Sequence, residues 1–218
     1  MCGRFTLASP GKIVAEVFGL DEQPFLIPRF NIAPTQDVTV VRAPSGRRQA
    51  ATQQWGLVPS WARDESIGSR LINARAETVA EKPAFRAALR ARRCLVIADG
   101  FYEWQAASGR KQPWYFRASH GLPFAFAGLW ERWQPPSGDA IESCTIVTTE
   151  ANEVVRPIHE RMPVILAQEC LDRWLTGGSV DELQGLLRPA PEELLQGYPV
   201  GLGVNNPAND DPSCIAPL

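Results

Sequence analysis

The sequence predicts an α+β fold in which a mostly antiparallel, barrel-like β-sheet is flanked by short helices. Five short segments between residues 94 and 148 are rich in β-branched and aromatic residues and are separated by turn-forming residues. Helical spacing occurs only before and after this strand-rich middle, and no alternation of strands with helices is present. No linker or change of composition divides the 218 residues, so we expect a single domain over residues 1–218.

The part of the chain before residue 94 is expected to contain two helices and a strand. Ser9 and Pro10 have the residue types of an N-cap and a first helical turn, and this helix is expected to end at Phe18. Residues 38–41 are β-branched throughout and are expected to form a strand. Residues 54–61 contain aromatic residues broken by glycine and proline, which favours a shaped surface over a long helix.

Residues 81–92 have helical spacing. Phe85, Ala88 and Leu89 fall on one face of the expected helix, whereas Arg86, Arg90 and Arg93 are expected toward solvent. The strands predicted next along the chain are residues 94–98, 101–104, 114–117, 124–130 and 144–148.

Turn residues separate these strands and predict which of them form hairpins. Asp99-Gly100 and Ser108-Gly109 each resemble a hairpin turn. After the last of these strands we expect a short helix over residues 151–158, a strand over 163–166, and helices over 167–175 and 180–187. The last twenty residues are expected to be loop, because proline and asparagine are frequent there.

The charge is unevenly distributed along the chain. Residues 1–110 carry 15 Lys+Arg against 10 Asp+Glu, a net +5, whereas residues 111–218 carry 7 against 14, a net −7. Only three of the 22 basic residues are lysine, and arginine is the better partner for phosphates and for stacking on bases. An arginine bias also accompanies GC-rich genomes. The basic first half is therefore compatible with nucleic-acid binding without establishing it.

The five cysteines have no spacing typical of a metal site, and the chain has only two histidines. No apolar run is long enough to span a membrane, and the N-terminus lacks a secretory signal pattern. We therefore expect a cytoplasmic protein, associated with the nucleoid in a bacterium, with no disulfide, metal or organic cofactor.

Cys2 is the most informative single residue. Removal of Met1 would leave an α-amine with a pKa of about 8 beside a thiol with a pKa of about 8.5. An aldehyde can form an imine with that amine, and the thiol can then close a five-membered thiazolidine ring in an intramolecular step.

Three further polar residues stand in unusual contexts. Asn73 follows an apolar run, and Glu103 lies between aromatic residues, where loss of water would raise the pKa of its carboxyl group. His159 is one of the two histidines, and the other, His120, precedes a glycine in an expected surface turn. Each of these residue types more often has a purely structural role.

Six blocks of sequence resemble, in order, the signature blocks of the SOS response-associated peptidase (SRAP) family, whose members process abasic sites and crosslink themselves to DNA. The blocks are residues 1–5 (MCGRF), 29–35 (RFNIAPT), 55–61 (WGLVPSW), 72–77 (INARAE), 99–104 (DGFYEW) and 159–163 (HERMP). The resemblance runs from Cys2 to Pro163 and continues more weakly to about Asn206.

The resemblance implies a catalytic role for four residues. Cys2 is the nucleophile that attacks the aldehyde of a ring-opened abasic sugar and ends as a thiazolidine. Asn73 orients the amine and the sugar, Glu103 is the acid and base that opens the sugar ring, and His159 shuttles protons in strand cleavage or crosslink reversal. Self-directed removal of Met1 and abasic-site lyase activity belong to the same expectation.

The resemblance also implies a DNA-contacting surface. Arg4, Arg75 and Arg161 are the expected phosphate contacts. Asn31, Pro34 and Trp61 match the base-facing loops of the family, where stacking on unpaired bases needs no sequence recognition. Two positions depart from some relatives: Trp61 is a single tryptophan followed by Ala62, and Met162 replaces a basic residue.

The implied partner is single-stranded DNA that contains abasic sites, with a monomeric protein acting near replication-fork proteins. Three alternatives stay open. A glutamine amidotransferase of the N-terminal-nucleophile class also exposes Cys2 before a glycine, although Arg4-Phe5-Thr6 departs from its apolar continuation. A non-catalytic single-strand-binding module would make Cys2 incidental, and a thiol peptidase could act on other proteins.

Overall fold

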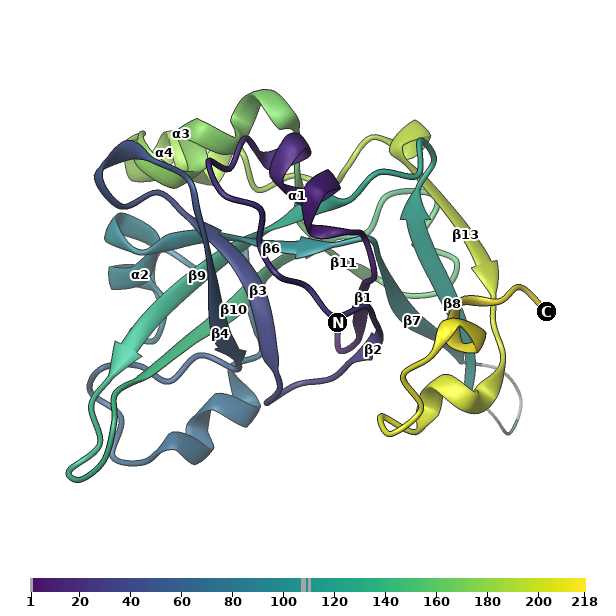
Figure 1. Ribbon diagram of the computed structural model, residues 1–218, viewed down its shortest axis with the longest axis horizontal. Coiled ribbons are helices and arrows are strands. Elements are labelled where there is room, and N and C mark those ends of the chain that lie inside the picture. The colour runs from purple at the N-terminus through teal and green to yellow at the C-terminus, as the bar shows by residue number, and fades with distance from the viewer. Residues whose placement is uncertain (1, 107–108, 110) are drawn as a thin grey trace.

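Five strands pair into a closed ring, which occupies the left half of the view in Figure 1. The computed structural model describes residues 2–106, 109 and 111–218. The strands of the ring are β3 (Asp37–Arg42), β4 (Gln49–Trp55), β6 (Arg93–Ala98), β9 (Phe124–Trp133) and β10 (Ile141–Glu150). They pair in the order β10-β4-β3-β6-β9, and β9 pairs with β10 to close the ring. Only the β10–β4 pairing within this ring is parallel, which confirms a mostly antiparallel, barrel-like sheet.

Three short strands extend this barrel. β5 (Asn73–Arg75) runs parallel to β10, and β11 (Arg161–Pro163) runs antiparallel to β10. β12 (Ile165–Leu166) pairs with β9 and ends the sheet. The strand expected over residues 163–166 is thus divided between two neighbours, because the chain leaves β10 and joins β9 at Val164.

A second, antiparallel sheet has the strand order β13-β8-β7-β1-β2. Its strands are β1 (Phe5–Leu7), β2 (Arg29–Ile32), β7 (Gly100–Ala106), β8 (Lys111–Ala118) and β13 (Leu195–Pro199). β1 lies between β7 and β2, and its Phe5 ring packs into the barrel, 5.1 Å from Trp55 and 5.8 Å from Phe126 between ring centroids. This packing fixes the N-terminal segment between the two sheets.

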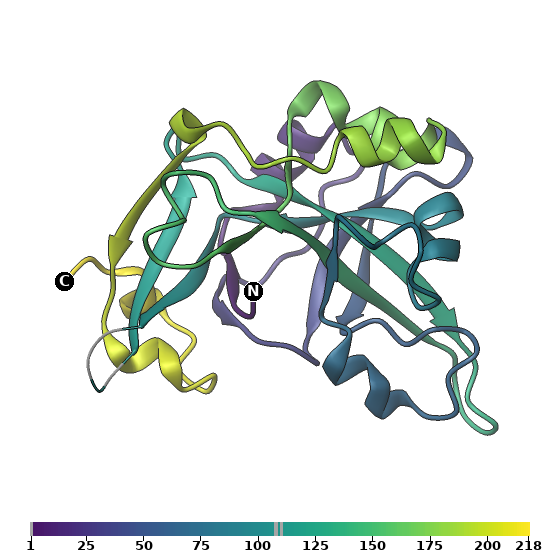
Figure 2. The same cartoon turned by 180° about the vertical axis from the view of Figure 1, so that it is seen from behind.

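Short helices complete the fold. Figures 1 and 2 show α1 (Gly11–Phe18), α3 (Leu171–Thr176) and α4 (Val180–Gly185) together along one side of the barrel, while α2 (Arg86–Ala91) lies beside β6 and β9. The 3-10 turns are η1 (Pro44–Gly46), η2 (Glu65–Arg70), η3 (Gln168–Cys170), η4 (Glu192–Leu194), η5 (Leu202–Asn205) and η6 (Pro212–Ile215). No helix within the described part of the chain is both long and apolar enough to cross a membrane.

The expected hairpin at Asp99-Gly100 is wrong. β6 pairs with β3 and β9, whereas β7 pairs with β1 and β8, so the chain passes from one sheet to the other at Asp99. The Asp99 carboxylate accepts hydrogen bonds from the Ser9 N–H (2.9 Å) and the Ser9 hydroxyl (2.6 Å). Ser9 is therefore held by Asp99 instead of capping α1, whose N-cap is Pro10.

Two helix predictions also need correction. The helix expected over residues 81–92 is shortened to α2, and Arg93 is buried where its guanidinium donates to the carbonyl oxygens of Leu89 (2.8 Å) and Arg90 (2.7 Å). Residues 153–158 form turns instead of a helix. The hairpin expected at Ser108-Gly109 involves Ser108, which lies outside the described residues, although β7 and β8 on either side of it pair.

Residues 54–61 form no helix, as expected, but residues 55–59 are buried and do not form the expected surface. Gly56 shows why the turn after β4 requires glycine. Gly56 has φ of +131°, and a Cβ there would lie 2.7 Å from the carbonyl oxygen of Gly68. Its N–H donates to the carbonyl oxygen of Cys144 (2.8 Å), so this turn is tied to β10.

Candidate active site around the N-terminal cysteine

Cys2 is placed by the pairing of the first strand. The N–H of Tyr102 donates to the carbonyl oxygen of Arg4 (3.0 Å), which continues the β1–β7 pairing toward the N-terminus. Cys2 itself is fully buried, and its thiol faces the Arg4 carbonyl oxygen at 4.0 Å. Glu103 follows Tyr102 on β7, and it lines the same cavity as Gly3 and Arg4, close enough to Cys2 for its charge to act on the thiol.

Asn73 approaches Cys2 from the barrel. β5 holds Asn73 opposite Ile146 of β10, and the Asn73 Nδ2 donates to the Cys2 carbonyl oxygen at 2.8 Å. The Asn73 Oδ1 is buried and has no hydrogen-bond partner among the described residues. An unpaired buried acceptor is unfavourable by about 1–3 kcal/mol, so this oxygen is poised for a donor supplied next to Cys2.

Glu103 and the Cys2 thiol both have pKa values raised by burial. The Glu103 side chain is nearly inaccessible, and loss of water raises its pKa to about 7. Burial, followed by the nearby Glu103 charge, raises the pKa of the Cys2 thiol well above its usual range. Near neutral pH, Glu103 can both give and take a proton, whereas the thiol stays protonated.

His159 follows the turns of residues 153–158 and precedes β11. Its Nδ1 accepts a hydrogen bond from the Arg161 N–H at 3.0 Å. Burial lowers the pKa of the imidazole, which keeps it neutral at pH 7. A neutral imidazole that accepts at Nδ1 carries its proton on Nε2, so that nitrogen is a donor.

A cavity of about 740 Å³ lies beside these groups, although neither Cys2 nor Asn73 is among the residues that line it. Its lining contains Glu103, His159 and the two residues that follow Cys2, together with side chains from β7, β8 and η5: Gly3, Arg4, Glu103, Trp104, Lys111, His159, Leu202 and Asn205. The four residues expected to be catalytic therefore lie around one place in the structure. Lys111 and Leu202 were not singled out from the sequence, because neither belongs to a signature block.

A C-terminal strap, residues 202–211, closes one wall of this cavity. The Asn31 side chain is fully buried and its Nδ2 donates to the carbonyl oxygens of Val204 (3.2 Å), Asn206 (3.1 Å) and Asn209 (2.6 Å). The Asp210 carboxylate accepts from the Asn31 N–H (2.8 Å), and also from the Phe30 N–H and the Arg29 Nε–H. Asn31 thus holds the strap, and its side chain does not face a base as expected.

Arg4 belongs to the same network. Its Nη1 donates to the Asn31 Oδ1 (2.7 Å) and to the Val204 carbonyl oxygen (2.8 Å), and its guanidinium lies 5.8 Å from the centroid of the Trp104 ring. Because Arg4 also lines the cavity, it connects the wall near Cys2 to the strap.

The other expected DNA contacts differ in accessibility. Trp61 is 58% exposed, Arg75 is exposed, and Pro34 is half-buried. Arg161 is half-buried: its Nη2 donates to the Glu77 carboxylate (3.0 Å) and to the Thr148 carbonyl oxygen (2.6 Å). Met162, which replaces a basic residue of some relatives, is fully buried.

The described residues contain no group of three or more His, Cys, Asp or Glu side chains that could hold a metal ion. The five cysteines are all free thiols, and Cys170 is the one among them that is not buried.

Comparison with known proteins gives consistent matches over nearly the whole chain. A family model described as "SOS response associated peptidase (SRAP)" matches residues 1–207. The "Abasic site processing protein YoqW" of Bacillus subtilis (strain 168) is 42% identical over 223 residues, which cover 99% of this chain and 99% of that protein. The "Abasic site processing protein HMCES" of Xenopus tropicalis is 34% identical over 199 residues, which cover 81% of this chain and 59% of that protein.

Solved structures agree with the fold. A crystal structure of a protein from Bacteroides thetaiotaomicron matches with a TM-score of 0.89 and 28% identity, and the match covers 100% of both chains. A crystal structure of a protein from Bordetella bronchiseptica matches with a TM-score of 0.80 and 28% identity over 92% of this chain.

Proposed function

Because this chain belongs to the SOS response-associated peptidase (SRAP) family, we propose that it processes abasic sites in DNA by capturing them covalently through Cys2. The names of relatives at 42% and 34% identity support abasic sites as the target. The observation that carries the covalent step is the gathering of Cys2, Asn73 and Glu103 beside a cavity that His159 also lines.

The proposed chemistry begins once Met1 has been removed. The free α-amine of Cys2 attacks C1′ of the ring-opened sugar and a C–N bond forms. The former carbonyl oxygen takes one proton from the amine and one from Glu103 and leaves as water, and the Glu103 carboxylate then takes back a proton from the resulting iminium nitrogen, which leaves a neutral imine. The Cys2 sulfur then attacks the same carbon and its proton passes to the nitrogen. The product is a thiazolidine, and the net change is the loss of one water molecule.

The pKa values support this order of steps. The thiol is held protonated by burial, so it is the weaker nucleophile at first, and the amine attacks before it. Thiol addition to the imine is then intramolecular, and this proximity compensates for the small thiolate fraction. Glu103, with a pKa of about 7, can donate the first proton and later accept another.

Asn73 and His159 are proposed to position the reactants. The Asn73 Oδ1 can accept a hydrogen bond from the amine while its Nδ2 holds the Cys2 carbonyl group. The His159 Nε2–H can donate to the sugar oxygen released by ring opening. The same residue is proposed to move protons in strand cleavage and in reversal of the crosslink.

Single-stranded DNA is the proposed substrate, with Trp61, Pro34 and Arg75 on its path. Exposed Trp61 can stack on unpaired bases, which is worth about 1–3 kcal/mol per base without sequence recognition. Phosphate contact by Arg161 would have to compete with Glu77. Removal of Met1 is proposed to be the protein's own peptidase activity, and capture would shield the lesion as a replication fork passes.

The test is a denaturing gel of the protein, mass-verified for loss of Met1, with a single-stranded oligonucleotide that carries one abasic site. We expect a heat-resistant, slowly migrating band with the wild type, no band with Cys2→Ala, and no band when the sugar has been reduced to an alcohol. An adduct on the reduced sugar would falsify the mechanism. Noncovalent binding that is equal in wild type and Cys2→Ala, with no adduct in either, would favour a plain binding module.

A further inference from the structure

The cavity beside Cys2 is larger than an abasic sugar alone requires. Its volume of about 740 Å³ lies within the range of about 300–1,000 Å³ that encloses a drug-sized ligand. An abasic residue has lost its base and brings only a sugar and a phosphate. Four of the lining residues have no part in the proposed reaction and form what is here the strap-side half of the cavity: Trp104, Lys111, Leu202 and Asn205.

The alternation of side chains along β7 separates this half from the reactive one. Glu103 and Trp104 are neighbours in the strand, so their side chains lie on opposite faces of the sheet. The Trp104 Nε1 donates to the Asn205 Oδ1 at 2.7 Å, which holds the indole on the side of the strap. Lys111 of β8 pairs with Ala106, two residues beyond Trp104, and therefore shares the face of Trp104. The first turn of the strap, η5, packs beside β8 (Figure 1).

Lys111 supplies a positive charge that no described carboxylate neutralises. Its side chain is exposed and makes no ion pair or hydrogen bond with the residues that the structure describes. The other basic residue of the lining, Arg4, already donates through Nη1 to the Asn31 Oδ1 (2.7 Å) and the Val204 carbonyl oxygen (2.8 Å).

The acid that lines the cavity does not cancel this charge. Glu103 is buried on the other face of β7, and its pKa of about 7 leaves about half of its carboxyl groups uncharged at neutral pH. An exposed ammonium group without a carboxylate partner is a suitable contact for one phosphate.

Leu202 supplies an apolar surface in the same half of the cavity. Its side chain is 45% exposed, and it stands on the strap that Asn31 and Asp210 hold in place. Because the strap is held, Leu202 does not have to be ordered when a ligand binds. Trp104 is half-buried in the same lining, with the Arg4 guanidinium 5.8 Å from its ring centroid. Apolar and aromatic side chains of this kind can stack on a base without reading its identity.

DNA held at Cys2 brings an intact nucleotide on each side of the lesion, and a nucleotide joins a phosphate to a planar base. We propose that the strap-side half of the cavity binds one of these two neighbouring nucleotides, with its phosphate on Lys111 and its base against Leu202 and Trp104. This subsite rests on the proposed capture of abasic sites by Cys2. It anchors the strand beside the lesion while the abasic sugar enters the reactive half.

The phosphate contact is tested by noncovalent binding. The probe is a short, fluorescently labelled single strand with a tetrahydrofuran residue, which has no aldehyde, in place of the abasic sugar. Lys111→Gln should lower the slope of log affinity against log salt by about 0.7 and weaken binding about fivefold at 0.1 M salt, as expected for one lost phosphate contact. Lys82→Gln, a matched change of an exposed lysine outside the cavity, should alter neither quantity.

Two changes in the DNA identify the bound nucleotide. A neutral methylphosphonate in place of one flanking phosphate should weaken binding by the wild type, whereas Lys111→Gln should lose nothing further at that position. Removing the base of the same neighbour, with a second tetrahydrofuran residue, should weaken binding by the wild type about fivefold or more and by Leu202→Ala about twofold or less. The side on which both effects occur, 5′ or 3′ of the lesion, gives the direction of the strand.

Failure of the subsite can be distinguished from failure of the covalent chemistry. The denaturing gel with aldehyde-bearing DNA tests capture through Cys2, whereas the tetrahydrofuran probe forms no adduct. Equal affinity and salt slope for wild type and Lys111→Gln, or equal losses at every methylphosphonate position, would overturn the subsite. A loss on base removal that is as large in Leu202→Ala as in the wild type would also overturn it. Thermal melting checks that each variant is folded.

Discussion

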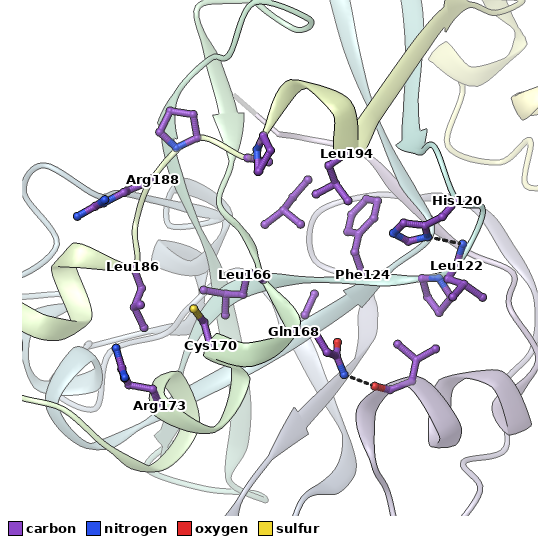
Figure 3. A pocket seen from close by; sticks show the side chains of 18 of the residues that line it. His120, Leu122, Phe124, Leu166, Gln168, Cys170, Arg173, Leu186, Arg188 and Leu194 are labelled. Atoms are coloured by element: carbon purple, nitrogen blue, oxygen red, sulfur yellow. Dashed lines mark hydrogen bonds between the residues drawn. The ribbon is translucent and has the colours of Figure 1, made fainter.

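The cavity beside Cys2 differs from a second hollow, the groove between α1, α3 and α4, in which charged groups it holds (Figure 3). The groove is larger, about 1160 Å³ against 740 Å³, yet its charged side chains are exposed and of both signs: Glu16, Arg173, Glu182, Arg188 and Glu193. In the cavity, Glu103 is 2% exposed and its pKa is raised to about 7. Water screens the charges of the groove, so they cannot be tuned for proton transfer. Burial of ionisable groups, more than volume, distinguishes a site of chemistry from a surface hollow.

The two surfaces are also supported differently. Buried polar contacts of Arg4, Asn31 and Asp210 hold the wall of the cavity, whereas apolar packing under Phe124 and Leu166 supports the groove. Buried polar networks fix one geometry because each unpaired member is costly. Apolar packing tolerates different side chains, so the groove should be the less sensitive of the two to substitution.

The largest expected effect is on the cavity's chemistry. Glu103→Gln should slow adduct formation about 100-fold or more, because the amide cannot transfer a proton. In the wild type, the rate of adduct formation should be bell-shaped with pH. The rate rises with pH as the amine becomes neutral, and it falls above about pH 7 as Glu103 loses the proton that it must donate. In the variant, only the limb that rises with amine deprotonation should remain. Quenched-gel time courses from pH 5 to 9 measure both.

A matched control for this variant is Glu150→Gln, which changes an exposed glutamate at the end of β10. It should keep the wild-type rate and the wild-type pH profile. A Glu103→Gln protein with an unchanged bell-shaped profile would remove Glu103 from the mechanism.

The same variant should be more stable than the wild type above neutral pH. The Glu103 pKa rises from 4.5 to about 7 on folding, so the folded state binds more protons than the unfolded state between these values. The free energy of unfolding therefore falls as pH rises from about 4.5 to 7, by about 3 kcal/mol at most. Urea unfolding should show Glu103→Gln gaining stability at pH 8 and little at pH 4.5. A variant that is less stable at pH 8 would contradict the desolvation argument.

Removing a contact that holds the strap should lower the free energy of unfolding by a somewhat smaller amount. Asp210→Ala removes an acceptor for three donors, from Arg29, Phe30 and Asn31, and should cost about 2 kcal/mol of unfolding free energy. The neighbouring Asp211 is the N-cap of η6, where its exposed carboxylate accepts from the Ser213 N–H. Asp211→Ala should therefore lower the free energy of unfolding by about 1 kcal/mol or less. Equal losses in the two variants, measured by urea unfolding, would show that the strap is not held through Asp210.

The sequence predicted the fold class and the residues around Cys2 better than the roles of individual polar residues. The β-branched and aromatic pattern predicted the barrel strands because that pattern is local. The failure at Asp99 arose because its partners, Ala8 and Ser9, are about 90 residues away in the chain. Local turn chemistry cannot reveal such a contact.

Asn31 and Arg93 show the same limit for side chains. Both are polar and stand in segments expected at the surface, yet each is buried and satisfied by main-chain carbonyl groups. Those carbonyl groups become available only once the strap and α2 are in place. A signature block thus identifies a residue that matters without distinguishing contact with DNA from support of the site.

The smallest expected effect is on the groove's side of the comparison. Arg188→Gln changes an exposed side chain that makes no hydrogen bond or ion pair with other described residues, so the unfolding free energy measured in urea should change by about 0.5 kcal/mol or less. The adduct rate at Cys2 should also be unchanged, because the two surfaces share no residue. An adduct rate that fell in this variant would show that the two surfaces are coupled.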